Sequence, residues 1–275
     1  MACSSEPEPV LKVGGIPDQD TARLARRYQS FADYLGKELG VEVEYVPSAD
    51  YAAVVTAFRQ GELQLAFFGA LTGVQARIQN PGAVAIAQRE GDAEFHTKFV
   101  ARPELGLTSL EDIKPQATEL TITFGSESST SGHLMPRYYL AEAGINPDED
   151  FRAPPSFSGS HDKTWQLVQS GSYDIGALSE SVWDRALSDG KVDPDAAVEF
   201  HITPAYFDYN WTAQGDLDQV YGSGFTAKLQ TALLKLNPQE HVEILELFST
   251  DRFIETNNAN YRTIEDVARG LDMIR

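Results

Sequence analysis

The fold is decided by Leu11-Lys12-Val13-Gly14, a short apolar stretch that predicts a β-strand, and by the apolar residues that follow it. These later residues recur every three or four positions, which is the spacing of one helix face: Leu24, Tyr28, Phe31, Leu35 and Leu39. A strand followed by an amphipathic helix is the repeating unit of an α/β sheet. We therefore expect an α/β fold from the start of the chain.

The same alternation continues downstream. Residues 41–46 alternate with period two, a helix-spaced segment then ends near Gly61, and residues 63–68 form an apolar run typical of a buried strand. Two more strands are expected at 84–87 and 95–101. Strands separated by helices predict a mostly parallel sheet.

The pattern pauses at residues 102–104 and then starts again, which predicts a second sheet with strands at 120–124, 174–177 and 198–202. The remainder, from residue 225, is helical and poor in strands, so we expect it to pack on the first sheet. The prediction is two lobes joined by two crossings of the chain, with residues 10–102 plus 212–275 in lobe 1 and residues 103–211 in lobe 2.

Composition restricts the possible functions. The chain has 275 residues, which suits two domains of ordinary size. It carries 22 Lys and Arg against 41 Asp and Glu, and the formal net charge of -19 argues against binding to nucleic acid or to anionic lipid. No apolar run is long enough to cross a bilayer, so the sequence predicts a soluble protein.

Residues 1–9 are acidic and rich in proline and serine, which predicts a disordered leader. The one cysteine, Cys3, excludes an intramolecular disulfide and a cysteine-based zinc site. A cysteine followed by serines is also how a mature bacterial lipoprotein begins, with the thiol acylated. The alternative, an incidental cysteine at a trimmed terminus, stays open.

The densest polar cluster follows a predicted strand and precedes a helix, at Ser126-Glu127-Ser128-Ser129-Thr130-Ser131-Gly132-His133. Hydroxyl groups and free backbone N–H groups at a helix start, together with the positive end of the helix dipole, form an anion site without lysine or arginine. The alternative is an ordinary helix cap.

Two other polar stretches are candidates. His161 begins a helix after Ser158-Gly159-Ser160, where its imidazole can donate to an anion or simply lie in solvent. The segment 205–211 combines aromatic residues with Asp208 near the predicted return crossing, and its alternative role is packing.

No enzyme motif is found. The sequence lacks a Gly-x-Ser-x-Gly elbow, a His-x-x-x-His metal pair and glycine-rich nucleotide loops of the known types. We predict no catalytic residue, no metal site and no cofactor.

Together these residues resemble the periplasmic substrate-binding proteins of phosphonate and phosphite ABC importers. The resemblance runs over nearly the whole chain from Val10, and its most specific part is Ser129-Thr130-Ser131-Gly132 with the downstream His161. It rests also on four further segments: Gly15-Ile16-Pro17-Asp18, residues 50–55, Gly159-Ser160-His161-Asp162 and residues 204–211. It implies a type II clamshell with two crossover hinge segments that closes on a small tetrahedral anion.

The resemblance also implies the ligand-binding residues. Ser129, Thr130 and Ser131 are expected on the oxyanion, with His161 donating from the second helix start and Tyr51 reaching in from the first lobe. Asp208 would accept a proton from a P–OH group, and Tyr209 would form a wall of the site. Whether Trp211 and Glu180 line the cleft is left open.

The implied ligand is phosphite or methylphosphonate. The implied partner is the membrane permease of an ABC transporter, and the implied compartment of this protein is the periplasm. Phosphate or 2-aminoethylphosphonate remain alternative ligands. A hydrolase acting on phosphonates and a receptor-coupled sensor remain alternative classes. We expect a monomer, because a clamshell must open and close.

Overall fold

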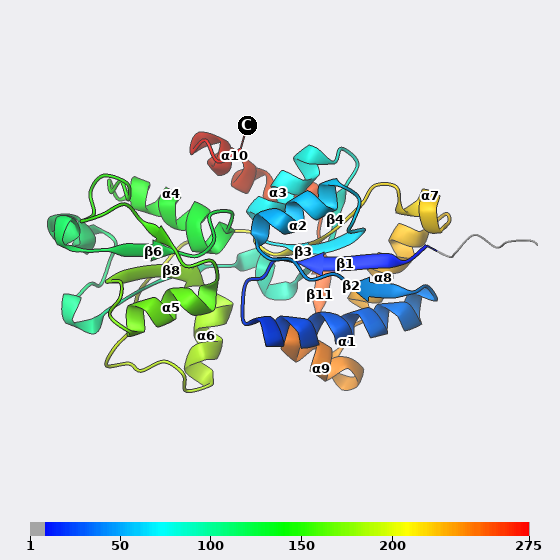
Figure 1. The fold of residues 1–275 in the computed structure, drawn as a ribbon, viewed down its shortest axis with the longest axis horizontal. Coiled ribbons are helices and arrows are strands. Elements are labelled where there is room, and N and C mark those ends of the chain that lie inside the picture. Colours follow the sequence, from blue (N-terminus) through cyan, green and yellow to red (C-terminus); the bar gives the residue numbers. More distant parts are fainter. Residues whose placement is uncertain (1–8, 275) are drawn as a thin grey trace, which may run out of the picture.

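The computed structural model describes residues 9–274, so Cys3 and nearly all of the predicted leader lie outside the described residues. Within this range the chain forms two sheets, one in each of two lobes (Figure 1). The two-lobed α/β prediction is confirmed. None of the described helices is both long enough and apolar enough to cross a membrane.

The first lobe is built on six strands. In sheet order they are β11 (Phe253–Glu255), β4 (Val84–Arg89), β10 (Asn210–Ala213), β3 (Leu65–Phe68), β1 (Leu11–Gly15) and β2 (Val43–Tyr45). Its helices are α1 (Thr21–Leu39), α2 (Tyr51–Arg59), α3 (Ala70–Gln79), α7 (Leu217–Tyr221), α8 (Phe225–Leu234), α9 (Pro238–Phe248) and α10 (Arg262–Gly270).

The second lobe is built on five strands. In sheet order they are β7 (Ser156–Phe157), β6 (Ile122–Phe124), β8 (Ile175–Ser179), β5 (Thr97–Ala101) and β9 (Val198–Ile202). Its helices are α4 (Met135–Glu142), α5 (His161–Gln169) and α6 (Glu180–Ser188), and a π-helical turn, Thr130–Leu134, leads into α4. Short 3₁₀ segments lie at Glu90–Glu94, Pro103–Leu105, Glu111–Glu119 and Asn258–Tyr261.

Helix α1 forms where the sequence predicts it. The Asp20 side chain caps its start by accepting a hydrogen bond from the Arg23 N–H, and Gly40 ends it with a φ of 73°. Its apolar face is buried, with Tyr28, Phe31 and Leu35 fully covered. The strand-then-helix unit is therefore stabilised by the packing of this face on the first sheet.

The sheets are mixed rather than mostly parallel. β10 runs antiparallel to both β3 and β4, and β5 runs antiparallel to both β8 and β9. Both strands directly follow a crossing and enter their sheet from the opposite end, which reverses their direction. The prediction of a mostly parallel sheet is wrong for this reason.

The crossings also come at different places from those predicted. The first lies between β4 and β5, so β5 pairs in the second sheet although the boundary predicted after residue 102 put it in lobe 1. The second lies between β9 and β10, and β10 pairs in the first sheet. The two crossings are joined where the Phe95 and Tyr206 backbones exchange two hydrogen bonds of 2.9 Å.

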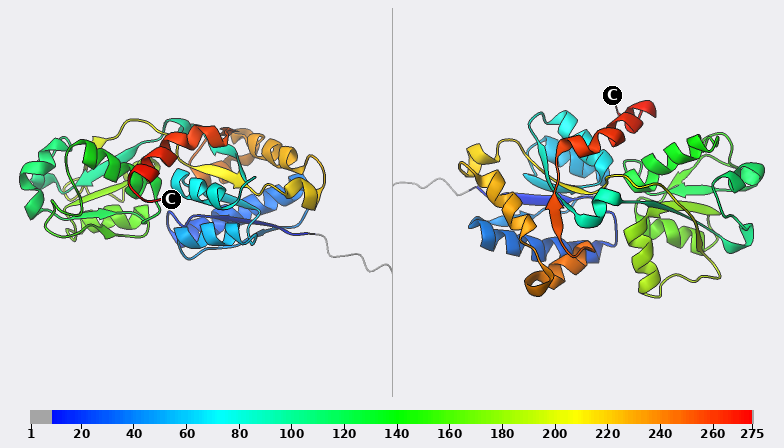
Figure 2. Two further views of the ribbon diagram at one scale, coloured as in Figure 1. Left: turned by 90° about the horizontal axis from the view of Figure 1, so that it is seen from above. Right: turned by 180° about the vertical axis from the view of Figure 1, so that it is seen from behind.

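Helix α10 belongs to the first lobe but lies over the junction between the lobes, as the views from above and behind show (Figure 2). It packs on α3 and also contacts the π-helical turn of the second lobe. The next residue, Leu271, shares a surface hollow with Ala141 of α4.

The core of the first lobe is rich in aromatic rings. The Trp211 ring stacks on Phe31 with centroids 4.5 Å apart and also contacts Phe67 and Phe248. Trp211 is fully buried. It therefore holds β10, the strand after the second crossing, against α1 and α9.

We expect Trp211→Ala to lower the free energy of unfolding by about 3–5 kcal/mol, because the cavity left by the ring cannot close completely. Urea unfolding followed by far-UV circular dichroism measures the change. Leu187→Ala is the control, since that side chain is 45% exposed and its loss should change stability by less than about 0.5 kcal/mol. A small effect of Trp211→Ala would show that the ring does not support the lobe.

Candidate functional site

The seven residues predicted to bind a ligand come together where the lobes meet. Each is at most 2% exposed: Tyr51, Ser129, Thr130, Ser131, His161, Asp208 and Tyr209. They come from the start of α2, the π-helical turn, the start of α5 and the second crossing. The sequence prediction that these residues are neighbours agrees with their placement, whereas their contact with a ligand stays a prediction.

The hydroxyl cluster, Ser129, Thr130 and Ser131, caps a helix and still has hydrogen-bond donors available. The Ser129 Oγ accepts a hydrogen bond of 3.0 Å from the Gly132 N–H, and the Thr130 Oγ1 accepts one of 3.0 Å from the Leu71 N–H. A hydroxyl that accepts still has its own hydrogen to donate. The Thr130 and Ser131 N–H groups, at the first positions of the turn, have no acceptor within it. These groups all lie on one wall of the junction.

His161 is fixed as a neutral donor. Its Nδ1 accepts a hydrogen bond of 3.2 Å from the Ser179 N–H, so the neutral ring carries its proton on Nε2. That Nε2 faces the Tyr209 hydroxyl at 3.4 Å. Burial lowers the pKa of His161 to about 4, so the ring is uncharged at neutral pH.

Asp208 is a buried carboxyl with one free oxygen. Its Oδ1 accepts a hydrogen bond of 3.0 Å from the Ala70 N–H at the start of α3. Its Oδ2 is buried and has no hydrogen-bond partner among the residues that the structure describes. Burial raises the pKa of Asp208 to about 7, which the nearby Thr130 and Ser131 side chains partly oppose. This oxygen can hold or accept a proton near neutral pH.

Two tyrosines complete the cluster. Tyr51 is the first residue of α2, and its buried Oη has no partner among residues 9–274. The Tyr209 ring stacks on Phe67 with centroids 5.4 Å apart and meets Phe95 edge-on at 5.6 Å. The junction therefore has an apolar wall beside its hydroxyl donors.

The sequence analysis missed a buried ion pair behind Tyr209. The Arg89 Nη2 lies 2.6 Å from the Asp92 Oδ1, and the Arg89 guanidinium lies over the Tyr209 ring at 4.4 Å. The Asp92 carbonyl accepts a hydrogen bond from the Asp208 N–H. The pair thus fixes the backbone and ring of two candidate residues. Its only sequence signal is an Arg and an Asp three positions apart after a strand, a spacing that is frequent on protein surfaces.

Hydrogen bonds join the two lobes directly, so the structure is closed. The His161 N–H donates to the Asp18 carbonyl at 3.2 Å, and the Asp20 N–H donates to the Asp162 carboxylate at 2.9 Å. Space is tight here, because a Cβ on Gly132 would lie 3.0 Å from the His161 Cε1. The closed junction excludes bulk water from the cluster.

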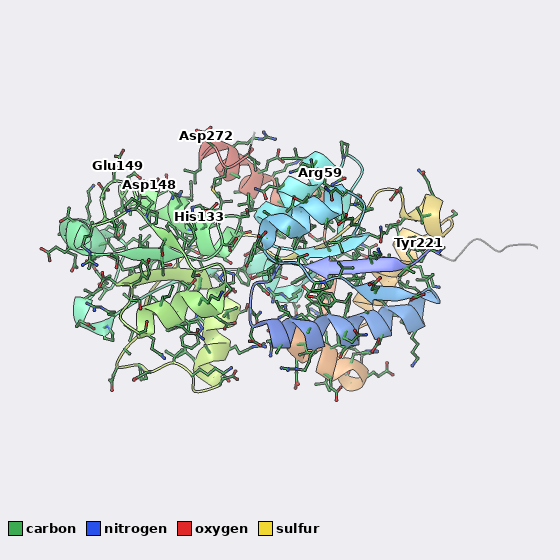
Figure 3. The ribbon with its side chains drawn as sticks, viewed as in Figure 1. Arg59, His133, Asp148, Glu149, Tyr221 and Asp272 are labelled. Atoms are coloured by element: carbon green, nitrogen blue, oxygen red, sulfur yellow. The ribbon has the colours of Figure 1, made fainter. Side chains whose placement is uncertain are left out.

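Three residues that the sequence singled out lie elsewhere. Glu180 accepts a hydrogen bond of 2.9 Å from the His96 N–H in the first crossing, and Trp211 lies in the core of the first lobe. His133 bonds the Glu127 carbonyl through Nδ1 and accepts from Arg137 at Nε2, so both ring nitrogens are occupied (Figure 3). Neither Glu180 nor Trp211 is part of the cluster.

The chemistry of the cluster suits a small oxyanion that carries a proton. Hydroxyl, imidazole and backbone donors surround one carboxyl, and the seven side chains include no lysine or arginine. The part of the chain that the structure describes contains no group of three His, Cys, Asp or Glu side chains placed to hold a metal ion.

The chain is similar to known proteins over most of its length. Residues 13–261 match the family model described as an ABC transporter, phosphonate, periplasmic substrate-binding protein. The chain is 45% identical over 270 residues to the probable ABC transporter phosphite binding protein PhnD1 of Prochlorococcus marinus, which covers 97% of this chain and 91% of that protein. It is 27% identical over 208 residues to the phosphate-import protein PhnD of Mycolicibacterium smegmatis, covering 68% of this chain and 64% of that protein.

The solved structure of Prochlorococcus marinus PhnD1 in complex with methylphosphonate superposes with a TM-score of 0.92. It is 44% identical, and the match covers 96% of this chain and 99% of that one.

Asp208→Asn tests the buried carboxyl through the stability of the empty protein. Because the folded pKa of Asp208, about 7, is above the usual value of 3.8, the folded state binds more protons than the unfolded state between these pH values. The free energy of unfolding therefore falls as pH rises from about 4 to about 7.

The side-chain amide in Asp208→Asn can keep the bond to Ala70 but has no charge to desolvate, so the variant should lack this fall. The difference from the native protein should grow to at most about 4 kcal/mol by pH 8. Denaturant unfolding of both proteins at pH 5 and pH 8 measures it. Equal pH dependence in the two proteins would mean that Asp208 does not titrate near 7.

Proposed function

This chain belongs to the periplasmic substrate-binding proteins of phosphonate ABC transporters, and on that premise we propose that it captures phosphite or methylphosphonate between its lobes. It is a transport component and not an enzyme. The observation that carries the ligand proposal is Asp208, a buried carboxyl with a free oxygen that faces neutral donors. A fully ionised anion would meet repulsion there, whereas a P–OH group would share its proton.

The donors divide between the two lobes. Ser129, Thr130 and Ser131 offer hydroxyl groups, Thr130 and Ser131 also offer backbone N–H groups, and His161 offers its Nε2–H from the start of α5. Tyr51 offers a buried hydroxyl from the first lobe. An anion bound by both walls favours the closed state, because its hydrogen bonds are complete only when the lobes meet.

The apolar wall supports the proposed preference for a P–H or P–CH₃ group. Tyr209 with Phe67 and Phe95 offers ring surface where a fourth phosphate oxygen would lose hydration without a new donor. Glu180 is engaged with the first crossing, and the buried Asp18 lies 3.6 Å from the Arg27 guanidinium, so we assign neither carboxylate to the amine of 2-aminoethylphosphonate. Phosphate is the competing ligand, because the relative from Mycolicibacterium smegmatis is named for phosphate import.

The partner of a substrate-binding protein of this family is the membrane permease of its ABC transporter, and its compartment is the periplasm. Two finer points are proposals. The protein acts as a monomer, since its lobes close on each other, and Cys3 tethers it to the membrane through an acyl chain. Analytical ultracentrifugation tests the first, and intact mass of the membrane fraction tests the second.

Calorimetric titration of the ligand-stripped protein at one pH and salt tests the ligand assignment. We expect one-to-one binding of phosphite or methylphosphonate, with phosphate and sulfate at least about tenfold weaker, because each misplaced or unpaired polar group loses more than about 1.4 kcal/mol. Tight sulfate binding by the native protein would contradict the role of Asp208.

The matched variants are Asp208→Asn and Glu149→Gln. The amide introduced by Asp208→Asn can donate but cannot accept a ligand proton in the same way, so we expect weaker binding of methylphosphonate and stronger binding of sulfate. Glu149 is an exposed carboxylate on the outer surface of the second lobe (Figure 3), and its loss should leave both affinities unchanged. An unchanged selectivity in Asp208→Asn would refute the assignment.

A further inference from the structure

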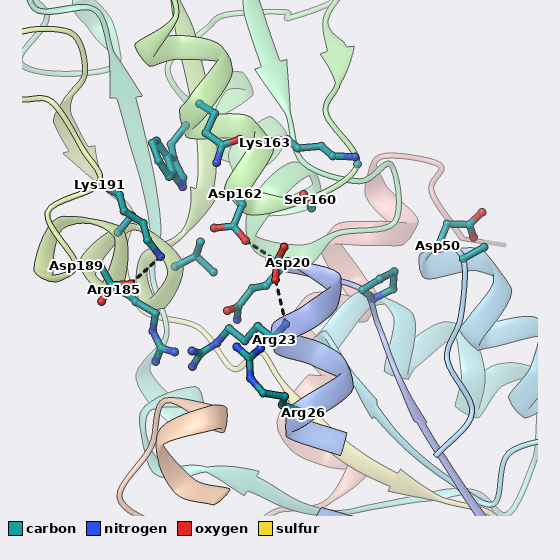
Figure 4. Close-up of a pocket in the computed structure, with 18 residues that line it drawn as sticks. Asp20, Arg23, Arg26, Asp50, Ser160, Asp162, Lys163, Arg185, Asp189 and Lys191 are labelled. Carbon is teal, nitrogen blue, oxygen red and sulfur yellow. Dashed lines mark hydrogen bonds and ion pairs between the residues drawn. The ribbon is translucent and has the colours of Figure 1, made fainter. Parts of the chain in front are cut away.

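A pocket of about 740 Å³ lies between the two lobes (Figure 4). Residues from both lobes line it, including the start of α1 in the first lobe and α5 and α6 in the second. Its rim includes Asp50 and Ser160, the residues that immediately precede Tyr51 and His161. None of the seven candidate residues lines the pocket, which lies beside them where the two lobes meet, and we call it the mouth.

The mouth has an unusual charge for this protein. Five basic side chains line it, against four carboxylates, in a chain whose net charge is -19: Arg23, Arg26, Lys163, Arg185 and Lys191. The four carboxylates keep their charge, so the formal charge of the mouth is five minus four, or +1, but each carboxylate also makes a short-range contact. Asp20 and Asp50 cap the starts of α1 and α2, Asp162 accepts from the Asp20 N–H, and Asp189 pairs with Lys191 at 2.9 Å.

The basic groups of the mouth fall into two kinds. Arg23 donates to the Glu246 and Leu247 carbonyls, and Arg185 donates to the Ser249 hydroxyl, so both reach the C-terminal end of α9. Arg26 and Lys163 are exposed, and neither side chain has a hydrogen bond or ion pair among residues 9–274. One comes from each lobe, and Arg26 also lines a neighbouring pocket together with Glu243 and Glu246.

We propose that the mouth is an electrostatic entry site that attracts the oxyanion ligand before the lobes close. The rest of the protein repels an anion, and the cluster itself offers only neutral donors, whose attraction is short-ranged. The excess positive charge of the mouth acts over roughly the 8 Å Debye length of physiological salt. Arg26 and Lys163 therefore set the rate of association and its salt dependence, without contacting the bound ligand. This inference rests on the proposed function.

The test is the double variant Arg26→Gln/Lys163→Gln, with Arg59→Gln/Lys114→Gln as its control. Both variants lower the net charge by two, but Arg59 and Lys114 are exposed residues outside the mouth, and Arg59 ends α2 on the outer surface of the first lobe (Figure 3). Stopped-flow fluorescence, to which Trp165 in the mouth contributes, gives association and dissociation rate constants for methylphosphonate and phosphite.

We expect the mouth variant to associate about three- to tenfold more slowly than the native protein at low ionic strength, since steering by local charge is worth about tenfold or more. The two rates should converge as salt rises to about 0.5 M, where the Debye length falls below about 5 Å. The dissociation rate constant should be unchanged, and the control should follow the native protein.

Other outcomes overturn the proposal. Equal association rates for the mouth variant and the native protein would show that Arg26 and Lys163 do not attract the ligand to the mouth. An equal loss in the control shows an effect of net charge alone. A deficit that persists at high salt, or a faster dissociation, shows that Arg26 or Lys163 contacts the bound ion. If the native protein binds neither methylphosphonate nor phosphite, the proposed function fails and this inference fails with it.

Discussion

The backbone pairing of Phe95 with Tyr206 joins the two crossings of the chain and thereby fixes where the two lobes meet. Because of this pairing the lobes meet along one line, and the residues after Tyr206 enter the junction at a fixed position. Asp208 and Tyr209 are two of these residues, and the Arg89–Asp92 pair holds them from behind. A hinge that also carries candidate ligand residues would couple closing of the lobes to completion of the site.

In the proposed function, neutral hydrogen-bond donors and not charged side chains bind the anion. A buried arginine on the ligand would bind sulfate as readily as a protonated phosphonate, whereas neutral donors around one carboxyl make the proton part of the recognition. His161 contributes to this because the Ser179 N–H holds its Nδ1, leaving a single donor of known direction. The basic side chains of the mouth lie outside the cluster, where water screens their charge, so they add little to the selectivity between anions.

Much of this could be predicted from the sequence, because hydroxyl residues between a strand and a helix have a local signature. Ser129, Thr130, Ser131 and His161 all lie at such helix starts. Strand direction and sheet membership have no local signature, so the sequence predicts neither the mixed sheets nor the pairing of β5 in the second lobe. The burial of Arg89 depends on contacts with Phe248 and Tyr209, residues far away in sequence, and no local pattern records it.

The position of α10 makes the end of the gene relevant to the middle of the protein. This helix touches the π-helical turn that carries the hydroxyl cluster, although it is encoded more than a hundred residues later. A chain that ended before Arg262 would keep every described strand of both sheets but would lose the buried Ile264 and Ala268 and the contact of α10 with the turn. We therefore expect such a truncation to destabilise the first lobe and to remove the support of the turn that carries the hydroxyl cluster.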